Sequence, residues 1–256
     1  MRNYAWSNKQ QNMAKAQEHT KMVETQYADA VAAVKSYIYG PERNYNQTFV
    51  KNEEMEVKVV NTDSVSAIFK FHEGKTAVLN FASYRHPGGM FIEGSQAQEE
   101  CLCHESILYN VLRQYQPYYD WNEQNRNRSL YLDRAIYSED VLFMRNMMKP
   151  VTADVITCAC PNKKAAQKYA GVSDGWNSRV LNERIHFLMD IAAERGVETL
   201  ILGAFGCGVF GQDPYEVAAV FKKYLEQYKC FKKVIFAVPQ GMHDFNHLAF
   251  VKTFSE

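Results

Sequence analysis

Short apolar runs alternate with longer amphipathic stretches along most of this chain of 256 residues. The runs have the length of buried strands, and the stretches have the apolar periodicity of helices that cover a sheet. This alternation predicts an α/β fold in which a mixed, largely parallel sheet carries helices on both faces. The predicted strands are 56–60, 76–81, 141–144, 154–158, 199–202 and 233–238. The predicted helices are 64–72, 99–115, 179–195 and 214–228.

The N-terminal segment differs from the rest of the chain. Residues 1–40 are rich in Ala, Gln, Lys and Glu and contain no proline. Apolar residues such as Val31 and Val34 recur there at helical spacing, so we expect helices near 7–19 and 24–38. We therefore predict an N-terminal helical extension over 1–40, packed on a single main domain over 41–256.

The charge of the chain is balanced, with 29 basic and 29 acidic residues. A surface of this kind lacks the long-range field that concentrates nucleic acid or anionic membranes, so neither is an expected partner. We see no membrane span and no signal peptide in the sequence. Six cysteines in this context indicate reduced thiols. We expect a cytoplasmic monomer that needs no cofactor.

The segment 79–100 breaks the local rules of regular structure, which is typical of functional sites. A predicted strand ends in a loop with three glycines and a proline, and the next helix begins with two acids. These residues are Pro87, Gly88, Gly89, Gly94, Gln98, Glu99 and Glu100. Glycines let a backbone approach a ligand closely and donate unobstructed N–H groups. Acids at a helix start are also favoured by the helix dipole, so a plain capped N-terminus is the alternative interpretation.

A second glycine-rich loop, 203–211, follows another predicted strand and precedes a helix that Asp213 and Pro214 begin. Such a loop presents backbone amides to an anion, commonly a phosphate. Its spacing fits neither the Walker loop nor the dinucleotide fingerprint, and a glycine-rich connection for tight packing is the alternative. Since both loops follow strands, both are expected at one cleft. A phosphate-binding loop opposite two glutamates suggests a phosphorylated sugar or nucleotide as the ligand.

Together the two loops resemble the signature of the bacterial-type poly(ADP-ribose) glycohydrolases, a branch of the macrodomain superfamily. That signature is a glycine-rich turn, a short spacer and Gln-Glu-Glu, and the second loop is similar to the diphosphate-binding loop of the family. Further matches at 79–82, 135–138, 154–162 and 236–238 follow in order over most of the chain. The resemblance implies a macrodomain-like fold with ADP-ribose in a cleft at the strand ends. It also implies a hydrolase that cleaves the ribose O-glycosidic bonds of poly(ADP-ribose).

The resemblance further implies roles for individual residues. Glu100 corresponds to the catalytic glutamate, and Glu99 to a neighbour that orients the ribose hydroxyls. Phe210 would pack on the distal ribose, and Asp63 would hold the adenine amino group. The implied substrate-binding residues are Asn80, Gly88, Gly89, Gln98, Gly206, Cys207, Gly208, Val209, Phe210 and Asp63.

Elementary chemistry agrees with the role of Glu100. Cleavage of a ribosyl bond passes through an oxocarbenium-like state, and the leaving oxygen needs a proton. Glu100 can donate it if burial and the nearby charge of Glu99 raise its pKa, and the resulting carboxylate can then activate water.

One departure from the family pattern is Met90, which stands where the family usually has a third glycine. A side chain there could narrow the cleft or change the accepted leaving group. Two alternatives therefore stay open: a hydrolase of mono-ADP-ribose on side chains such as arginine, and a module that binds ADP-ribose without cleaving it. The Gln-Glu-Glu acids favour an enzyme over a binding module.

Possible metal sites are not favoured. Cys101 and Cys103 are two residues apart on a predicted helix and point about 200° from each other, so they cannot share a zinc ion. Cys158 and Cys160 are expected to fill the core, and the pair His243 and His247 lacks further ligands nearby. The aromatic residues within 115–129 are expected to pack a long connection against the body of the protein.

Overall fold

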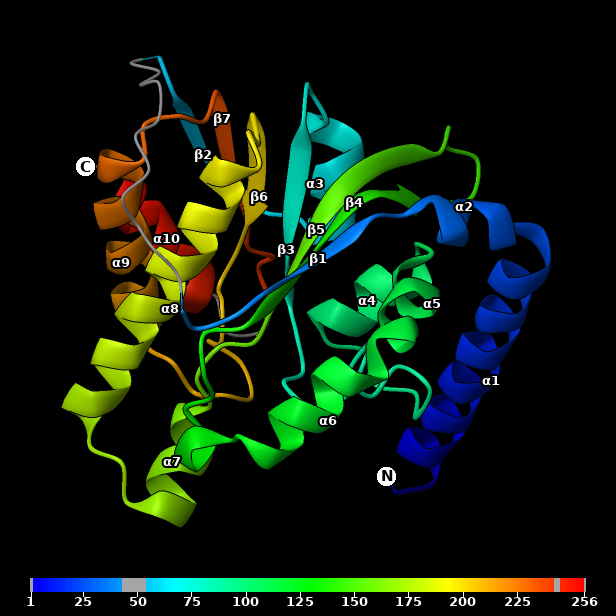
Figure 1. Ribbon diagram of the computed structural model, residues 1–256, viewed down its shortest axis with the longest axis horizontal. Coiled ribbons are helices and arrows are strands. Elements are labelled where there is room, and N and C mark those ends of the chain that lie inside the picture. Colours follow the sequence, from blue (N-terminus) through cyan, green and yellow to red (C-terminus); the bar gives the residue numbers. More distant parts are fainter. Residues whose placement is uncertain (1, 43–53, 242–244, 256) are drawn as a thin grey trace.

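The computed structural model describes residues 2–42, 54–241 and 245–255, with side chains from residue 8 onward, and these residues contain one seven-stranded sheet. Its order is β1-β4-β5-β3-β6-β7-β2 (Figure 1). The strands are β1 (Ser36–Tyr39), β2 (Glu56–Val60), β3 (Thr76–Phe81), β4 (Ala135–Phe143), β5 (Val151–Cys158), β6 (Thr199–Leu202) and β7 (Lys233–Ala237). The five strands from β5 to β2 run parallel, whereas β4 and β1 are antiparallel to their neighbours. The predicted mixed, largely parallel sheet is confirmed.

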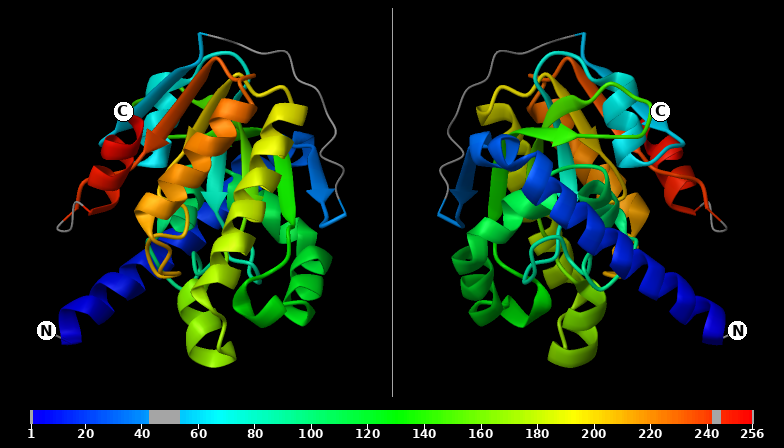
Figure 2. Two further views of the ribbon diagram at one scale, coloured as in Figure 1. Left: turned by 90° about the vertical axis from the view of Figure 1, so that its left-hand side faces the viewer. Right: turned by 90° about the vertical axis from the view of Figure 1, so that its right-hand side faces the viewer.

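Helices cover both faces of this sheet (Figure 2). Helices α8, α9 and α10 pack on one face, and α1, α3, α4 and α5 pack on the other. The helices are α1 (Arg2–Gln26), α2 (Ala28–Ala33), α3 (Ser64–Phe71), α4 (Gln98–His104), α5 (Leu108–Leu112), α6 (Gln116–Gln124), α7 (Lys163–Ala170), α8 (Asp174–Glu194), α9 (Pro214–Gln227) and α10 (Phe245–Phe254). None of these described helices combines the length and apolar composition that a membrane span requires.

The central strands are buried on both sides, which explains their continuous apolar sequences. Val78 of β3 belongs to the core beneath α4 and α5, whereas its neighbour Leu79 belongs to the core beneath α8 and α9. Both side chains are fully buried, because successive residues of a strand point to opposite faces. A parallel sheet covered in this way favours nearly continuous apolar runs in its central strands.

The N-terminal segment differs from the prediction. A single helix, α1, spans the first predicted helix and reaches Gln26, and the short α2 follows it. The second predicted helix is wrong over its last part, because Ser36–Tyr39 forms the edge strand β1. This strand pairs antiparallel with β4, with Tyr37 opposite Tyr137, and alternating aromatic side chains suit such pairing. The division of the chain at residue 40 stays a prediction.

Three further parts of the prediction differ from the structure. The predicted helix 99–115 is broken at Ser106, whose hydroxyl donates to Leu102 O (2.6 Å) and accepts from the N–H of Leu108 (3.1 Å). Serine competes with the helical backbone in this way and ends α4 before α5 begins. The segment 115–129, expected as an irregular connection, contains α6, whose Tyr118 and Tyr119 are buried against the body. Strand β4 begins at Ala135, earlier than predicted.

Candidate active site

A cavity of about 480 Å³ opens at the carboxyl ends of the parallel strands. Its walls include Phe81 at the end of β3, Cys160 after β5 and Val238 after β7, together with residues of the loop that follows β6. This is the edge of an open α/β sheet where ligands bind. The lining is mainly apolar, with a few polar groups, and the volume suits a small organic ligand.

The carboxyl group of Glu100 is fixed between the first glycine loop and the start of α4. Its Oε1 accepts a hydrogen bond from the N–H of Met90, and its Oε2 accepts one from the N–H of Ala97, both at 2.9 Å. Ala97 directly precedes α4, so Glu100 caps its own helix. The side chain is 5% exposed. Capping and a functional role therefore involve the same carboxylate, and the two interpretations do not exclude each other.

The neighbouring carboxyl group of Glu99 is held from the opposite side. Its Oε2 accepts from the N–H of Ser83 (2.7 Å), and its Oε1 accepts from Asn80 Nδ2 (3.1 Å). Burial raises the pKa of Glu99 to about 8, against the lowering effect of these hydrogen bonds, and the charge of Glu100 adds to the rise. Glu99 is thus the acid that keeps a proton near neutral pH.

The glycine turn lies directly on these two acids. Gly88 and Gly89 have φ angles of +68° and +63°, which side chains other than glycine rarely adopt. A Cβ atom on Gly89 would lie 2.7 Å from Glu100 Oε1, and one on Gly88 would lie 2.7 Å from the ring of Tyr109. Glycine is therefore required at both positions by the backbone and by the space available.

Met90 occupies the third position of the turn and, like Gly88, Gly89, Glu99 and Glu100, is not among the described residues of the cavity wall. Its φ is not positive, and its side chain is 49% exposed. Its N–H still donates to Glu100. The third glycine of the family pattern can thus be replaced here because only the backbone of this residue serves the acid.

The second glycine loop offers backbone donors at the cavity. Within the described part of the chain, no hydrogen bond uses the N–H groups of Gly208, Val209 and Phe210. Such groups can bind an anion, as predicted for a diphosphate. The N–H of Cys207 is different, because it donates to Ala204 O (3.1 Å) within the loop. Backbone donation by Cys207 to a ligand is therefore not available in this conformation.

The same loop packs closely on the end of β5. Gly206 has φ +77°, and a Cβ atom there would overlap Cys160 Sγ. The thiol of Cys207 itself is half-buried, and burial raises its pKa to about 12. A thiol with this pKa stays protonated at neutral pH and is a poor nucleophile.

Two buried amides that the sequence analysis missed hold the second loop in place. Gln212 Nε2 donates to Asn177 Oδ1 (2.9 Å), and Asn177 Nδ2 donates to Gln212 Oε1 (2.8 Å). Gln212 also donates to Pro161 O (2.8 Å), so the loop is tied to both α8 and the end of β5. A glutamine between a glycine and an N-cap residue carries no spacing signal, and its partner lies far away in the sequence.

An aromatic stack, also missed, connects the two glycine-rich loops. Phe210 packs on Tyr131 with ring centroids 6.2 Å apart, and Tyr131 stacks on Tyr84 at 4.3 Å. Tyr84 belongs to the first loop, and Phe210 lines the cavity. The position predicted for Phe210, beside a bound ribose, is compatible with this arrangement.

Gln98 of the Gln-Glu-Glu sequence lines the cavity and anchors α4 to the sheet. Its Oε1 accepts from the N–H of Phe81 (2.8 Å). Its Nε2 donates to Leu79 O (2.9 Å) and to Ser64 Oγ (3.0 Å). Because its amide is satisfied on both sides, Gln98 sets the position of the acids that follow it.

Asn80 and Asp63 lie on different sides of the site. Asn80 is fully buried behind Glu99 and is not among the described residues of the cavity wall. Asp63 lines the cavity and caps α3 through the N–H of Ser66 (2.8 Å). Partial burial alone would raise the pKa of Asp63. The hydrogen bonds from Ser66 and the charge of Arg145 outweigh this effect and hold the pKa below its usual value.

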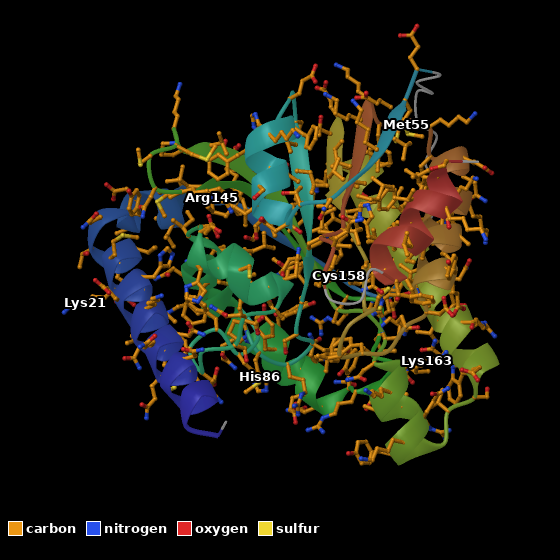
Figure 3. All side chains as sticks on the ribbon, turned by 180° about the vertical axis from the view of Figure 1, so that it is seen from behind. Lys21, Met55, His86, Arg145, Cys158 and Lys163 are labelled. Atoms are coloured by element: carbon orange, nitrogen blue, oxygen red, sulfur yellow. The ribbon has the colours of Figure 1, made fainter. Side chains whose placement is uncertain are left out.

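The remaining candidates show ordinary contacts. Cys158 is fully buried in the core, as expected, and in Figure 3 the exposed His86 of the first loop lies below it. His247 Nδ1 contacts Val238 O at 2.7 Å, and His243 lies outside the described residues. Among the residues that the structure describes, no three His, Cys, Asp or Glu side chains are grouped to hold a metal ion.

The structure thus holds an acid pair against one glycine turn and presents unused backbone N–H groups in a second glycine loop, which are groups for acid–base chemistry and for binding an anion. Comparison with known proteins then gives the family. A family model for the catalytic domain of microbial-type PARG, the poly(ADP-ribose) glycohydrolases, matches residues 6–146, more than half of the chain. The chain belongs to this family and is a glycohydrolase. The predicted family is confirmed.

Solved structures agree with this assignment. The poly(ADP-ribose) glycohydrolase from Thermomonospora curvata is 29% identical, with a TM-score of 0.86 over 96% of this chain and 100% of that chain. The enzyme from Deinococcus radiodurans, solved in complex with ADP-ribose, is 31% identical, with a TM-score of 0.78 over 90% of this chain and 97% of that chain. No curated protein sequence matches the chain.

Proposed function

We propose that this glycohydrolase cleaves the ribose O-glycosidic bonds of poly(ADP-ribose), with Glu100 as the general acid and base. The observation that carries the proposal is the fixed position of the Glu100 carboxyl between two backbone N–H groups, directly beneath the bare backbone of Gly89. A ribose that approaches beside Gly89 meets no side chain at that residue. The preorganised carboxyl can then act without reorientation.

The reaction needs two proton transfers, one to the leaving oxygen and one from the attacking water. The bond between the anomeric carbon and the leaving oxygen breaks, its electron pair stays on the oxygen, and Glu100 supplies the proton. Water then adds to the oxocarbenium ion and gives a proton to the Glu100 carboxylate, which restores the enzyme. The acid pair holds a proton near neutral pH because the pKa of Glu99 is about 8.

The cavity supports ADP-ribose as the ligand. Free N–H groups of Gly208, Val209 and Phe210 suit a diphosphate, and the apolar walls suit an adenine ring. We propose that Asp63, which lies on the cavity wall, accepts a hydrogen bond from the adenine amino group. The structure of the Deinococcus radiodurans relative with ADP-ribose supports the same ligand for this chain.

Hydrolysis of arginine-linked mono-ADP-ribose uses the same anomeric carbon and stays the alternative. The sequence argument for it was the side chain of Met90. Neither Met90 nor Glu100 is among the described residues of the cavity wall, so the position of Met90 does not separate the two substrates. A pure binding module would not need two buried acids beside the turn. We further propose a cytoplasmic monomer without nucleic acid as a partner, since one chain supplies every residue of the site and its six cysteines are unpaired.

The test compares product release by the wild type and Glu100→Gln from ADP-ribose polymer and from arginine-linked mono-ADP-ribose. Glutamine keeps one acceptor for the helix cap but cannot transfer a proton as a carboxyl does. The control is Glu93→Gln, an exposed acid of the same loop. Loss of polymer cleavage in Glu100→Gln alone supports the proposal. Full activity of that variant contradicts it, and release only from the mono-modified substrate favours the alternative.

A further inference from the structure

Helix α1 rests directly on the first glycine loop. A Cβ atom on Gly94 would lie 2.5 Å from the backbone oxygen of Lys9 and 3.0 Å from the backbone nitrogen of Met13. Gly94 also has φ +79°, so glycine is required at this contact. In Figure 1 the loop between β3 and α4 reaches the lower half of α1. The N-terminal helix is therefore in backbone contact with the segment that carries the site.

One side chain of α1, Asn12, binds this segment on two sides. Its Nδ2 donates to Gly94 O, and its Oδ1 accepts from Gln96 Nε2, both at 3.3 Å. Both groups of a single amide are thus used on residues two positions apart. Gln96 is also a residue of the cavity wall. The Asn12 amide therefore fixes the end of the loop at the edge of the cavity.

The loop transmits this anchoring to the acid. The two N–H groups that hold Glu100 belong to Met90 and Ala97, and they flank the anchored residues in sequence. Within the loop, the N–H of Ser95 donates to Met90 O at 3.1 Å, which joins the two halves. Movement of residues 94–96 away from α1 would therefore shift both donors of Glu100.

A buried aromatic contact supports the same attachment. Phe91 is fully buried in the loop, with its ring centroid 4.6 Å from that of His104 and 6.3 Å from that of His19 on α1. His19 Nε2 lies 2.8 Å from Ser106 O, just after α4. Hence α1 contacts the loop and the region after α4, and Asn12 is the α1 side chain hydrogen-bonded to the loop among the described residues.

We propose that Asn12 is a positioning residue of the catalytic site, which holds the loop so that the N–H groups of Met90 and Ala97 fix the Glu100 carboxyl. The inference rests on the proposed catalytic role of Glu100. It makes the N-terminal helix part of the machinery of the reaction. Small displacements of a reacting group lower the rate strongly, while most of the cavity wall, including Asp63 and the second glycine loop, belongs to other segments of the chain.

The test uses Asn12→Ala in the full chain. This variant removes both hydrogen bonds, and alanine does not weaken the helix, since asparagine is the poorer helix former. We expect kcat on ADP-ribose polymer to fall roughly ten- to hundredfold, with KM and the Kd of ADP-ribose changed by less than about threefold. Asn12→Gln keeps both amide groups and should recover part of kcat. Gln11→Ala, an exposed neighbour on α1, is the control and should match the wild type.

A second measurement does not depend on turnover. Amide hydrogen exchange at Met90 and Ala97 should be faster in Asn12→Ala than in Gln11→Ala. Unchanged kcat and unchanged exchange in Asn12→Ala would overturn the inference. Equal losses of kcat in Asn12→Ala and Gln11→Ala would overturn it as well, because they would show a general effect of α1. An inactive wild type with faster exchange in Asn12→Ala would contradict the catalytic proposal but support the positioning of the loop.

Discussion

Asn80 donates a hydrogen bond to Glu99 across 3.1 Å, and neither side chain has appreciable contact with solvent. The amide thus stands directly behind the acid pair, at the end of β3, and keeps one carboxyl oriented. A donor in a buried position favours the ionised form of its partner and opposes the effect of burial on the pKa.

Replacing Asn80 with alanine should destabilise the protein by about 1–3 kcal/mol, because Glu99 would lose a buried partner. The pKa of Glu99 should rise further, since the lost donor lowers it. Chemical denaturation measures the first effect, and carbon-detected NMR titration of the Glu99 carboxyl measures the second. Thr157→Val is the control, because it removes the 3.3 Å contact of Asn80 with Thr157 and leaves the bond to Glu99. A lowered Glu99 pKa in Asn80→Ala would contradict the prediction.

The buried Glu99 predicts a pH dependence of stability. Its pKa is about 8 when folded and about 4.5 in the unfolded chain, so the folded state binds more protons between these values. The contribution of Glu99 to stability is therefore fully present below about pH 4.5 and is lost as the pH rises through about 8. The free energy of unfolding, measured from pH 5 to pH 8, should fall in the wild type relative to Glu99→Gln. Parallel curves for the two proteins would show that Glu99 titrates normally.

A side chain added at Gly89 is expected to displace the two acids and lower the activity. In Gly89→Ala the new methyl group would lie 2.7 Å from Glu100 Oε1 and 2.9 Å from Glu99 Oε2. We expect kcat to fall about a hundredfold or more, because the carboxyl must move. Gly171→Ala is a matched control, since Gly171 has a similar φ of +61° and open space around it. Similar losses of activity in both variants would mean that backbone strain, rather than contact with the acids, is responsible.

A substitution at Gly208 tests whether the second glycine loop binds the diphosphate. A Cβ atom at this residue meets nothing within 4 Å, so Gly208→Glu should fold normally. Its carboxylate would lie near the free N–H groups and repel a diphosphate, and the affinity for ADP-ribose should fall roughly tenfold or more. Calorimetric titration with ADP-ribose gives the Kd, and Gly208→Gln supplies the same size without charge. Equal affinity in the Glu and Gln variants would show that the diphosphate binds elsewhere.

The sequence predicted best some strands of the parallel part of the sheet, both in its centre and at its edge. The strands 56–60, 76–81 and 199–202 coincide with β2, β3 and β6, because an apolar run bounded by turn residues has few other uses. The edge strand β1 was missed, since it is short and follows a strongly helical segment. The break between α4 and α5 was missed because it depends on the hydrogen bonds of Ser106, which a helical periodicity does not reveal.

The functional site, too, was predicted only where its residues are neighbours in the sequence. The acids and glycines were found from their local order, because their chemistry depends on neighbours in sequence. The residues that hold them were not found, since each acts across a long separation: Asn177 on Gln212, Tyr131 on Tyr84, and Asn12 on Gly94. Their residue types are common in solvated positions and acquire their roles only after folding.

Strand β1 has a consequence for how the chain can be divided. It covers one edge of β4, whose other edge is already paired with β5. A shortened chain that begins after residue 40 would leave the outer backbone groups of β4 unpaired next to the aromatic side chain of Tyr137. Exposed strand edges of this kind recruit other chains. With β1 in place, the edge of the sheet is a strand of four residues instead of the nine-residue β4, and short edge strands recruit other chains less readily.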